Sequence, residues 1–331
     1  MFNKKWSMAA IASIALVLSA CAGGTSTETT SPTPAGDDQA AVTESLTIGF
    51  AQATQQSPFY VALGDGVRAA AEAAGAELIY VDANGDIEKQ NNDIEDLITQ
   101  GVDAILINPV DPQGIAPSMA SAEAAGIPVI TVDRFAEGAI AHIGRDNVAM
   151  GRLVGDAVLA ALGDEGGKIL EIQGDAGGTV ATDRSNGFNA AFEGVDSVEV
   201  VQGPYAEYVR ANAVTAMQDL LQAHPDVRAV YAHNDDMALG ALQVLLENDR
   251  TDVFVSGVDG LMEAVEAMND GDQYVATSLN DPISLGAIAA QAAIAAANGE
   301  PVEDYIDAGT GLVQKSNAAD YLGDTLFAEA R

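Results

Sequence analysis

The sequence predicts an α/β protein with two doubly wound lobes, each a parallel sheet covered by helices on both faces. Two observations predict this fold class. From Leu46 onward, short apolar runs alternate with amphipathic stretches of helical length, and this alternation is typical of parallel sheets. The alternation then restarts after "AHIGRDN" (141–147), so we expect two similar halves with a break near Asp146.

The first half reads as an alternation of strands and helices that begins and ends on a strand. Ser57 is the expected N-cap of the first helix, because Pro58 follows it in the first turn and Gly75 stands just past the end. The expected strands are 46–52, 76–82, 103–109 and 127–133, and the expected helices are 57–75, 86–101 and 112–126.

The second half continues the alternation and closes on a long alanine-rich helix. Its strands are again short and apolar, as expected for strands buried on both faces. The expected strands are 167–174, 198–203, 228–235, 252–260 and 274–280, and the expected helices are 147–163, 181–194, 208–225, 236–248, 261–271 and 281–299.

Composition excludes some classes of partner. The chain has 331 residues, enough for two ordinary domains, with 14 Lys and Arg against 49 Asp and Glu, a net charge of −35. Nucleic acid is not an expected partner, because phosphate contacts need clustered Lys and Arg, and the same holds for docking on an anionic bilayer through basic residues. The excess of acidic residues has two interpretations. It keeps the protein soluble, for example in a saline medium, or it repels anionic ligands.

The N-terminus indicates export and lipidation. Residues 1–20 have a basic start and an apolar stretch too short to span a bilayer well, as in a signal peptide. "LSAC" (18–21) looks like a bacterial lipobox, so we expect Cys21 to carry the lipid. Because Cys21 is the only cysteine, an intramolecular disulfide and a thiolate metal site are excluded. Residues 21–44, rich in Ser, Thr, Gly and Pro, are expected to form a disordered tether to the outer face of the cell membrane.

Polar side chains gather at the expected strand ends, where open parallel sheets bind ligands. In "PVITVDRF" (128–135) a buried strand ends in Asp133 and Arg134. These two residues form either a surface ion pair without a function or part of a binding site. Carboxylates accept from sugar hydroxyls, Arg and Asn donate to them, and aromatic rings cover the apolar face of a sugar. Since such residues recur in both halves, we favour a site for a polyhydroxylated ligand. The candidates are Phe59, Tyr60, Asp133, Arg134, Arg184, Tyr208, Asn234 and Asp259.

The body resembles the periplasmic sugar-binding proteins of ABC transporters, of the ribose-binding type. "SPFYVALGDGV", "ILINPVD", "IPVITVDR", "HIGRDNVAMG", "AHPDVRAVYAHNDDMALGAL" and "GVDG" carry the resemblance, which extends from Leu46 to about Val313. It implies a type I periplasmic binding protein fold, in which three hinge strands join two lobes that close on a sugar. The implied lobes are 45–146 plus 281–308 and 147–280 plus 309–331.

The resemblance also implies binding residues. The ligand-binding Asp-Arg pair of the family falls on Asp133 and Arg134, and its hinge-side Gln falls near Asn280. The other implied positions, including the stacking aromatics, are Phe59, Tyr60, Arg184, Tyr208, Asn234 and Asp259. Two departures are Ser57, where ribose binders usually have Asn, and Val258, where they have Phe. These departures weaken the expectation of D-ribose itself and leave that of a small sugar or polyol.

The implied function is that of an extracytoplasmic solute-binding lipoprotein, which delivers a monosaccharide or polyol to an ABC permease. We expect a monomer that is not an enzyme and uses no cofactor or metal. Two alternatives stay open: a receptor that passes its closed form to a membrane signalling protein, and a binder of a non-sugar small molecule. A LacI-type repressor shares the body fold, but the lipobox and the missing DNA-binding headpiece argue against it.

Other motifs give weaker indications. Asp82, Asn84 and Asp86 resemble the start of a calcium loop, but the glycine and the final glutamate of such a loop are misplaced, so helix capping is expected. "GDAGG" (174–178) lacks the glycine spacing and the lysine of nucleotide-binding loops. The histidines are scattered, and no catalytic residue can be argued from spacing.

Overall fold

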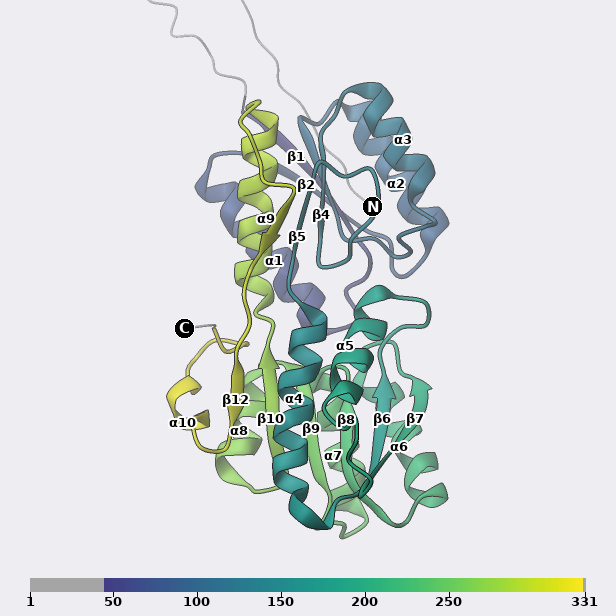
Figure 1. Cartoon of the computed structure of the whole chain (residues 1–331). Helices are drawn as coiled ribbons and strands as arrows, with labels where there is room; N and C mark the ends of the chain where they lie inside the picture. Colours follow the sequence, from purple (N-terminus) through teal and green to yellow (C-terminus); the bar gives the residue numbers. More distant parts are fainter. Residues whose placement is uncertain (1–44, 330–331) are drawn as a thin grey trace, which may run out of the picture. The chain divides into compact units, whose positions relative to one another are not determined.

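The computed structural model describes residues 45–329, which form two α/β lobes, each built on one six-stranded sheet (Figure 1). The predicted signal peptide (1–20), Cys21 and the predicted tether (21–44) lie outside the described residues. None of the described helices is long and apolar enough to cross a membrane.

The sheet of the first lobe is parallel throughout and has the strand order β11-β5-β4-β3-β1-β2. The central strands β3 and β4 are buried along their whole length, as expected for a parallel sheet covered on both faces. The strands are β1 (Thr47–Gln52), β2 (Glu77–Asp82), β3 (Ala104–Ile107), β4 (Val129–Val132), β5 (Ala141–Gly144) and β11 (Tyr305–Asp307).

The sheet of the second lobe repeats this topology as β12-β10-β9-β8-β6-β7. It differs in one edge strand, because β12 runs antiparallel to β10. The strands are β6 (Gly167–Gln173), β7 (Val198–Tyr205), β8 (Val227–Ala232), β9 (Phe254–Asp259), β10 (Tyr274–Leu279) and β12 (Leu312–Gln314).

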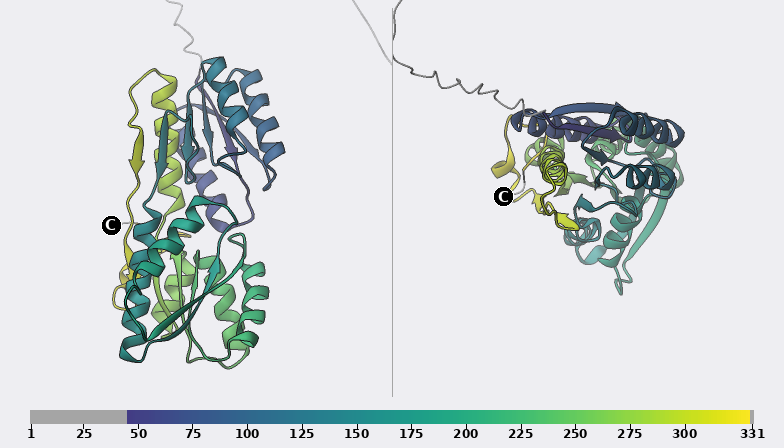
Figure 2. Two further views of the ribbon diagram at one scale, coloured as in Figure 1. Left: turned by 45° about the vertical axis from the view of Figure 1, so that its right-hand side comes forward. Right: turned by 90° about the horizontal axis from the view of Figure 1, so that it is seen from above.

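Helices cover both faces of each sheet (Figure 2). In the first lobe α1 packs against α9 on one face, and α2 packs against α3 on the other. In the second lobe α4 packs against α5 on one face, and α6, α7 and α8 cover the other. The helices are α1 (Pro58–Ala73), α2 (Ile87–Gln100), α3 (Ala116–Ala125), α4 (Asn147–Leu162), α5 (Thr179–Ala190), α6 (Arg210–Ala223), α7 (Asp235–Glu247), α8 (Met262–Asp270), α9 (Pro282–Ala297) and α10 (Ala318–Tyr321), with a 3-10 turn at Gly163–Glu165.

The chain passes between the lobes three times. Residues 145–146 lead from β5 to α4, residues 280–281 lead from β10 to α9, and residues 308–311 lead from β11 to β12. These three short segments are called the crossings below. The second crossing begins at Asn280, which also lines the cavity described below.

The structure confirms the predicted fold class and shifts some element boundaries. Strand β5 lies in 141–147, where we expected only a break. Helix α3 begins at Ala116 instead of 112, because the carboxylate of Asp111 accepts from the amides of Gln113 and Gly114 and holds a turn. Helix α5 starts and ends earlier than expected. Helix α6 begins after Tyr208, whose φ of 59° lies in the left-handed region and is not helical.

Candidate ligand-binding site

A small cavity lies between the strand ends of the two lobes and holds about 260 Å³ of empty space. Its walls come from the start of α1 and the end of β4 in the first lobe, and from α5, the loop before α6 and the ends of β8, β9 and β10 in the second. The lining residues are Ser57, Phe59, Tyr60, Asp133, Arg134, Val180, Arg184, Tyr208, Asn234, Asp259 and Asn280. The structure therefore brings together all nine predicted residues and adds Ser57 and Val180. Ligand binding by them stays a prediction.

Ser57 is the N-cap of α1, as predicted, but its side chain makes no capping hydrogen bond. Its Oγ atom is buried without a hydrogen-bond partner among residues 45–329. Because Ser57 lines the cavity, this hydroxyl is free for a ligand. A capping serine and a site serine give the same sequence signal, so the sequence alone did not separate them.

Asp133 and Arg134 follow β4 and have different partners. Asp133 has a φ of 64°, a conformation that non-glycine residues adopt rarely and often at functional sites. Within the described chain its carboxylate meets only the Arg134 guanidinium, at a long N–O distance of 4.0 Å. Arg134 instead donates to the Tyr60 hydroxyl at 2.6 Å and to the Pro109 carbonyl at 3.1 Å. The Asp133 carboxylate is therefore left for another donor.

Arg134 also contacts the second lobe. Its Nη2 atom lies 3.3 Å from Oδ2 of Asp175, and both side chains are mostly buried. Asp175 stands just after β6, in "GDAGG", and was not among the predicted site residues. No local signal distinguishes it, because its partner is a residue of the other lobe.

Arg184 and Asp259 form the corresponding pair in the second lobe. The Nε atom of Arg184 donates to Oδ1 of Asn147 at 2.9 Å, and Nη1 donates to the carbonyl of His233. Nη2 lies 3.8 Å from the Asp259 carboxylate. Asp259 has a φ of 122° and accepts from Nδ2 of Asn280 at 3.0 Å. The second lobe thus presents a pair whose members are both held by their neighbours.

Asn234 and Tyr208 contribute polar atoms to the same wall. The Oδ1 atom of Asn234 caps α7 by accepting from the amide of Met237 at 3.0 Å, and Nδ2 donates to the carbonyl of Tyr208 at 3.4 Å, so one Nδ2 hydrogen remains. The Tyr208 hydroxyl is buried and has no hydrogen-bond partner in the described part of the chain. A Cβ atom at Gly174 would lie 2.1 Å from the Tyr208 ring. The first glycine of "GDAGG" therefore makes room for this ring.

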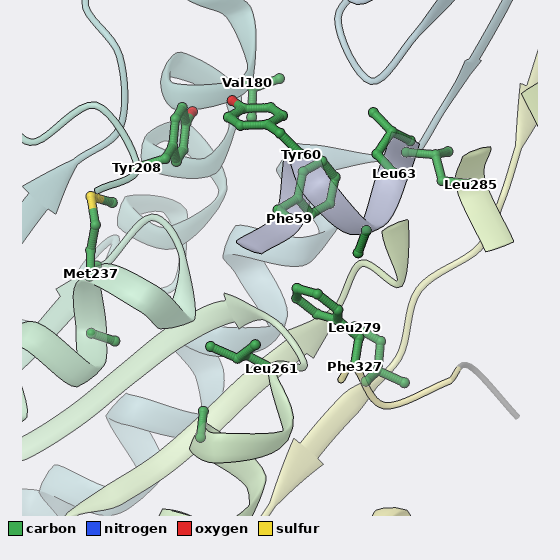
Figure 3. Close-up of a cluster of buried hydrophobic side chains, with 14 of the residues drawn as sticks. Phe59, Tyr60, Leu63, Val180, Tyr208, Met237, Leu261, Leu279, Leu285 and Phe327 are labelled. Atoms are coloured by element: carbon green, nitrogen blue, oxygen red, sulfur yellow. The ribbon is translucent and has the colours of Figure 1, made fainter. Parts of the chain in front are cut away.

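The aromatic residues that line the cavity are Phe59, Tyr60 and Tyr208, and Figure 3 shows them within the hydrophobic cluster to which they belong. Phe59 and Tyr60 meet edge to face with ring centroids 5.5 Å apart. Phe59 also meets Phe327 at 6.5 Å, from the C-terminal segment that pairs with Leu261 of the second lobe. Val258, the departure from the family pattern, is buried in the apolar cluster beneath α4 and α5 and does not line the cavity.

The charges that line the cavity balance. Asp133 and Asp259 stand against Arg134 and Arg184, so a neutral ligand leaves the balance unchanged. Burial raises the pKa of Asp133, although the nearby Arg134 opposes this shift. Burial likewise raises the pKa of Asp259 well above its usual value, against the effect of Arg184. Both carboxylates are thus poorly solvated acceptors, and they gain from a donor in the cavity.

Arg145 is a second residue that the sequence did not indicate. It lies in the first crossing, is 7% exposed, and donates from Nη1 to Oδ1 of Asn280 at 3.0 Å. Its motif, "HIGRDN", does not show whether the arginine is buried, because burial depends on the two other crossings.

The remaining motifs have structural roles. Asp86 caps α2 by accepting from the amides of Glu88 and Lys89, as expected. Across residues 45–329, no group of three or more His, Cys, Asp or Glu is placed to hold a metal ion.

Comparison with known proteins identifies the family. The model of the periplasmic binding protein domain matches residues 48–301, so the chain belongs to the periplasmic binding protein family. The ribose import binding protein of Bacillus subtilis is 38% identical over 265 residues, which are 80% of this chain and 85% of that protein. The xylitol-binding protein of Mycolicibacterium smegmatis is 32% identical over 289 residues, 86% of this chain and 78% of that protein.

A solved structure is more similar. It is an ABC transporter solute-binding protein from Mycobacterium smegmatis with bound glycerol. It is 64% identical, has a TM-score of 0.85, and covers 86% of this chain and 100% of its own. The similarity thus extends over almost the whole described body.

Proposed function

We propose that this protein is the solute-binding lipoprotein of an ABC sugar importer and binds a monosaccharide or small polyol between its lobes. One observation carries the proposal: acceptors, donors and aromatic rings from both lobes line a single small cavity. Relatives named for ribose import and xylitol binding, and a similar solved structure with bound glycerol, support this ligand class.

Each group in the cavity has a role in the proposal. Asp133 and Asp259 accept hydrogen bonds from ligand hydroxyls, and Arg184 donates to a ligand oxygen. The free Nδ2 hydrogens of Asn234 and Asn280 also donate. Phe59, Tyr60 and Tyr208 cover the apolar C–H faces, and the hydroxyls of Tyr208 and Ser57 either donate or accept.

Charge narrows the ligand class. The balanced charges that line the cavity favour a neutral ligand, because an added anion would be buried without a counter-ion. A pentose, a hexose, an inositol or a linear polyol meets this condition, and a sugar phosphate does not.

Closure and delivery complete the proposed mechanism. The lobes in this proposal are 45–146 plus 281–308 and 147–280 plus 309–331, and the crossings between them act as the hinge. A ligand favours the closed form only through contacts that the open form lacks, and here both lobes supply such contacts. A lipid on Cys21, after removal of 1–20, would hold the receptor at the outer face of the membrane beside its permease.

A panel of neutral compounds tests the proposal. We would measure thermal unfolding of the purified chain with pentoses, hexoses, linear polyols and inositols, and titrate each hit by calorimetry. A ligand at about 1,000 times its Kd adds about 4 kcal/mol to the free energy of unfolding, which shifts the Tm by a few degrees. Recovery of the bound compound unchanged separates binding from turnover.

The expected result is a strong response to one or a few neutral polyhydroxylated compounds and none to ribose 5-phosphate. A folded chain with a flat response to every sugar and polyol would overturn the proposed ligand class. The next candidates would then be non-sugar small molecules.

A further inference from the structure

Arg145 connects the three crossings. Its Nε atom donates to the carbonyl of Gly309 in the third crossing at 2.6 Å. Its Nη2 atom donates to the carbonyl of Asp281 and to Oγ of Ser284, both at 3.1 Å, at the second crossing and the start of α9. Arg145 itself lies in the first crossing, so one buried guanidinium joins all three.

The same guanidinium fixes the orientation of a cavity side chain. Nη1 of Arg145 lies 3.0 Å from one end of the Asn280 amide, and the other end lies 3.0 Å from Oδ1 of Asp259. A guanidinium only donates and a carboxylate only accepts. The amide oxygen must therefore face Arg145, and the amide nitrogen must face Asp259. In the reverse orientation the amide nitrogen would face Arg145, donor against donor, and the amide oxygen would face Asp259, acceptor against acceptor.

We propose that Arg145 is a positioning residue that makes Asn280 a donor-only group for the ligand. This inference rests on the proposed function of the cavity. Its oxygen is turned toward Arg145, which does not line the cavity, and its nitrogen is turned toward Asp259, which does. Asn280 therefore has one Nδ2 hydrogen for Asp259 and one for the ligand. The ligand atom at this place must accept, as a hydroxyl, ring or ether oxygen does. Because Arg145 also binds the crossings, the orientation of Asn280 depends on the hinge geometry.

A measurement without ligand tests the orientation directly. The Asn280 side-chain amide is assigned in NMR spectra by its absence in Asn280→Ala. In Arg145→Met, hydrogen exchange of this amide should become faster by at least about tenfold, because the loss of a charged hydrogen bond releases the amide. Ser284→Ala removes another partner of Arg145 without touching Asn280 and should leave the exchange unchanged. An unchanged exchange rate in Arg145→Met would overturn the proposal.

A double-mutant cycle tests the effect on binding, with whichever of D-ribose, L-arabinose, xylitol, myo-inositol and glycerol binds wild type most tightly. Arg145→Met should weaken binding about tenfold in the wild-type background and less than about twofold in Asn280→Ala, because the effect passes through Asn280. An equal loss in both backgrounds would mean a purely structural role for Arg145. If Arg145→Met does not fold, Arg145→Lys replaces it in both measurements, since an ammonium lacks the fork that reaches every crossing.

The outcomes separate the two proposals. No binding by wild type to any of these compounds contradicts the proposed ligand class, while the exchange measurement still decides the role of Arg145. Binding by wild type with an additive cycle contradicts only the role of Arg145.

Discussion

Each lobe brings one aspartate and one arginine to the cavity, but the two lobes hold these residues differently. In the first lobe Asp133 and Arg134 are consecutive at the end of one strand, yet their charged groups lie 4.0 Å apart. In the second lobe Arg184 and Asp259 come from a helix and a strand, lie 3.8 Å apart, and each makes hydrogen bonds within that lobe.

The two pairs differ in which of their charged groups already have hydrogen-bond partners in the protein. In the first lobe Arg134 donates to Tyr60 and Pro109 and lies close to Asp175 of the other lobe. Within residues 45–329 the Asp133 carboxylate accepts no hydrogen bond and meets Arg134 only at 4.0 Å. In the second lobe both charged groups are held before a ligand arrives. We therefore infer that Arg184 and Asp259 are held in place before the ligand binds. Asp133 is interpreted as the acceptor to which the ligand donates a hydrogen bond when the lobes close.

Removal of Arg184 should have the largest effect on binding. Arg184 is 3% exposed, and Arg184→Met would leave the buried Asp259 without its cation as well as remove a ligand donor. We expect affinity for the best panel compound to fall by about 2–5 kcal/mol, which is at least roughly 30-fold. Calorimetric titration measures the loss, and circular dichroism checks that the variant is folded.

Arg152→Met is the matched control for this prediction. Arg152 is on α4 of the same lobe, is half exposed, and within residues 45–329 pairs only with Asp156 and the carbonyl of Ala190. Its replacement should leave affinity unchanged. Wild-type affinity in Arg184→Met would show that the second-lobe pair does not contact the ligand.

Asp133→Asn should have an intermediate effect that depends on pH. Burial raises the pKa of Asp133, so the free site takes up a proton at a higher pH than an ordinary aspartate does. Affinity should fall as the pH decreases through this raised pKa, because the protonated carboxyl is a weaker acceptor. At neutral pH Asp133→Asn should weaken binding by about 1.5–3 kcal/mol. Titrations from about pH 4, the ordinary pKa of an aspartate, up to neutral pH compare the variant with wild type.

Asp133→Asn should not lower the stability of the unliganded chain, although it lowers ligand affinity. An acid whose pKa is higher in the folded than in the unfolded chain destabilises the fold above that pKa, and the effect is relieved as the pH falls. Asp133→Asn should therefore keep or raise the Tm near neutral pH while it weakens binding. Weaker binding together with a lower Tm would instead indicate that Asp133 supports the fold. Any pH dependence of binding left in the variant would come from other buried acids, such as Asp259 in the cavity wall and Asp235 beside Asn234, whose pKa values burial also raises.

The sequence predicted the alternating elements, the two similar halves and the nine cavity residues, because each depends on local information. A strand end in a parallel sheet has a fixed place relative to the other strand ends, so polar residues there could be grouped without a structure. Family resemblance then placed Asn280, and residue chemistry indicated the remaining eight. Short edge strands such as β11 and β12 carry too few residues for a pattern.

Asp175 and Arg145 could not be predicted in this way. Asp175 gains its role from Arg134 in the other lobe, and Arg145 gains its role from backbone carbonyls in two distant crossings. Neither relation leaves a periodic or spaced signal in the sequence. Ser57 shows a third case: it is the N-cap, as predicted, but the sequence did not indicate that its side chain would make no capping hydrogen bond.

Asp175→Asn should have the smallest effect on ligand affinity. It tests whether the contact between Arg134 and Asp175, which joins the two lobes, contributes to binding. The variant removes an ion pair between the lobes, with an N–O distance of 3.3 Å, and leaves the site residues of both walls in place. Asp175 lines the open mouth of the cleft, and the amide oxygen of the variant can still accept a hydrogen bond from Arg134. We therefore expect affinity to fall by only about 0.2–1 kcal/mol. The wild-type advantage should shrink from about 0.01 M to 1 M salt, as the Debye length falls. Titrations of both proteins at low and high salt measure this.

Glu207→Gln is the matched control, since Glu207 lines the mouth of the same cleft and makes none of the ion pairs found in residues 45–329. It removes the same charge, so it separates the Arg134–Asp175 contact from the general effect of a less acidic cleft. If both variants change affinity equally, the cross-lobe contact contributes nothing of its own to affinity. If only Asp175→Asn lowers affinity, and if the loss is smaller at high salt, the contact between Arg134 and Asp175 contributes to binding. Arg134 then depends on lobe closure for one of its partners, whereas Arg184 has its partners within the second lobe.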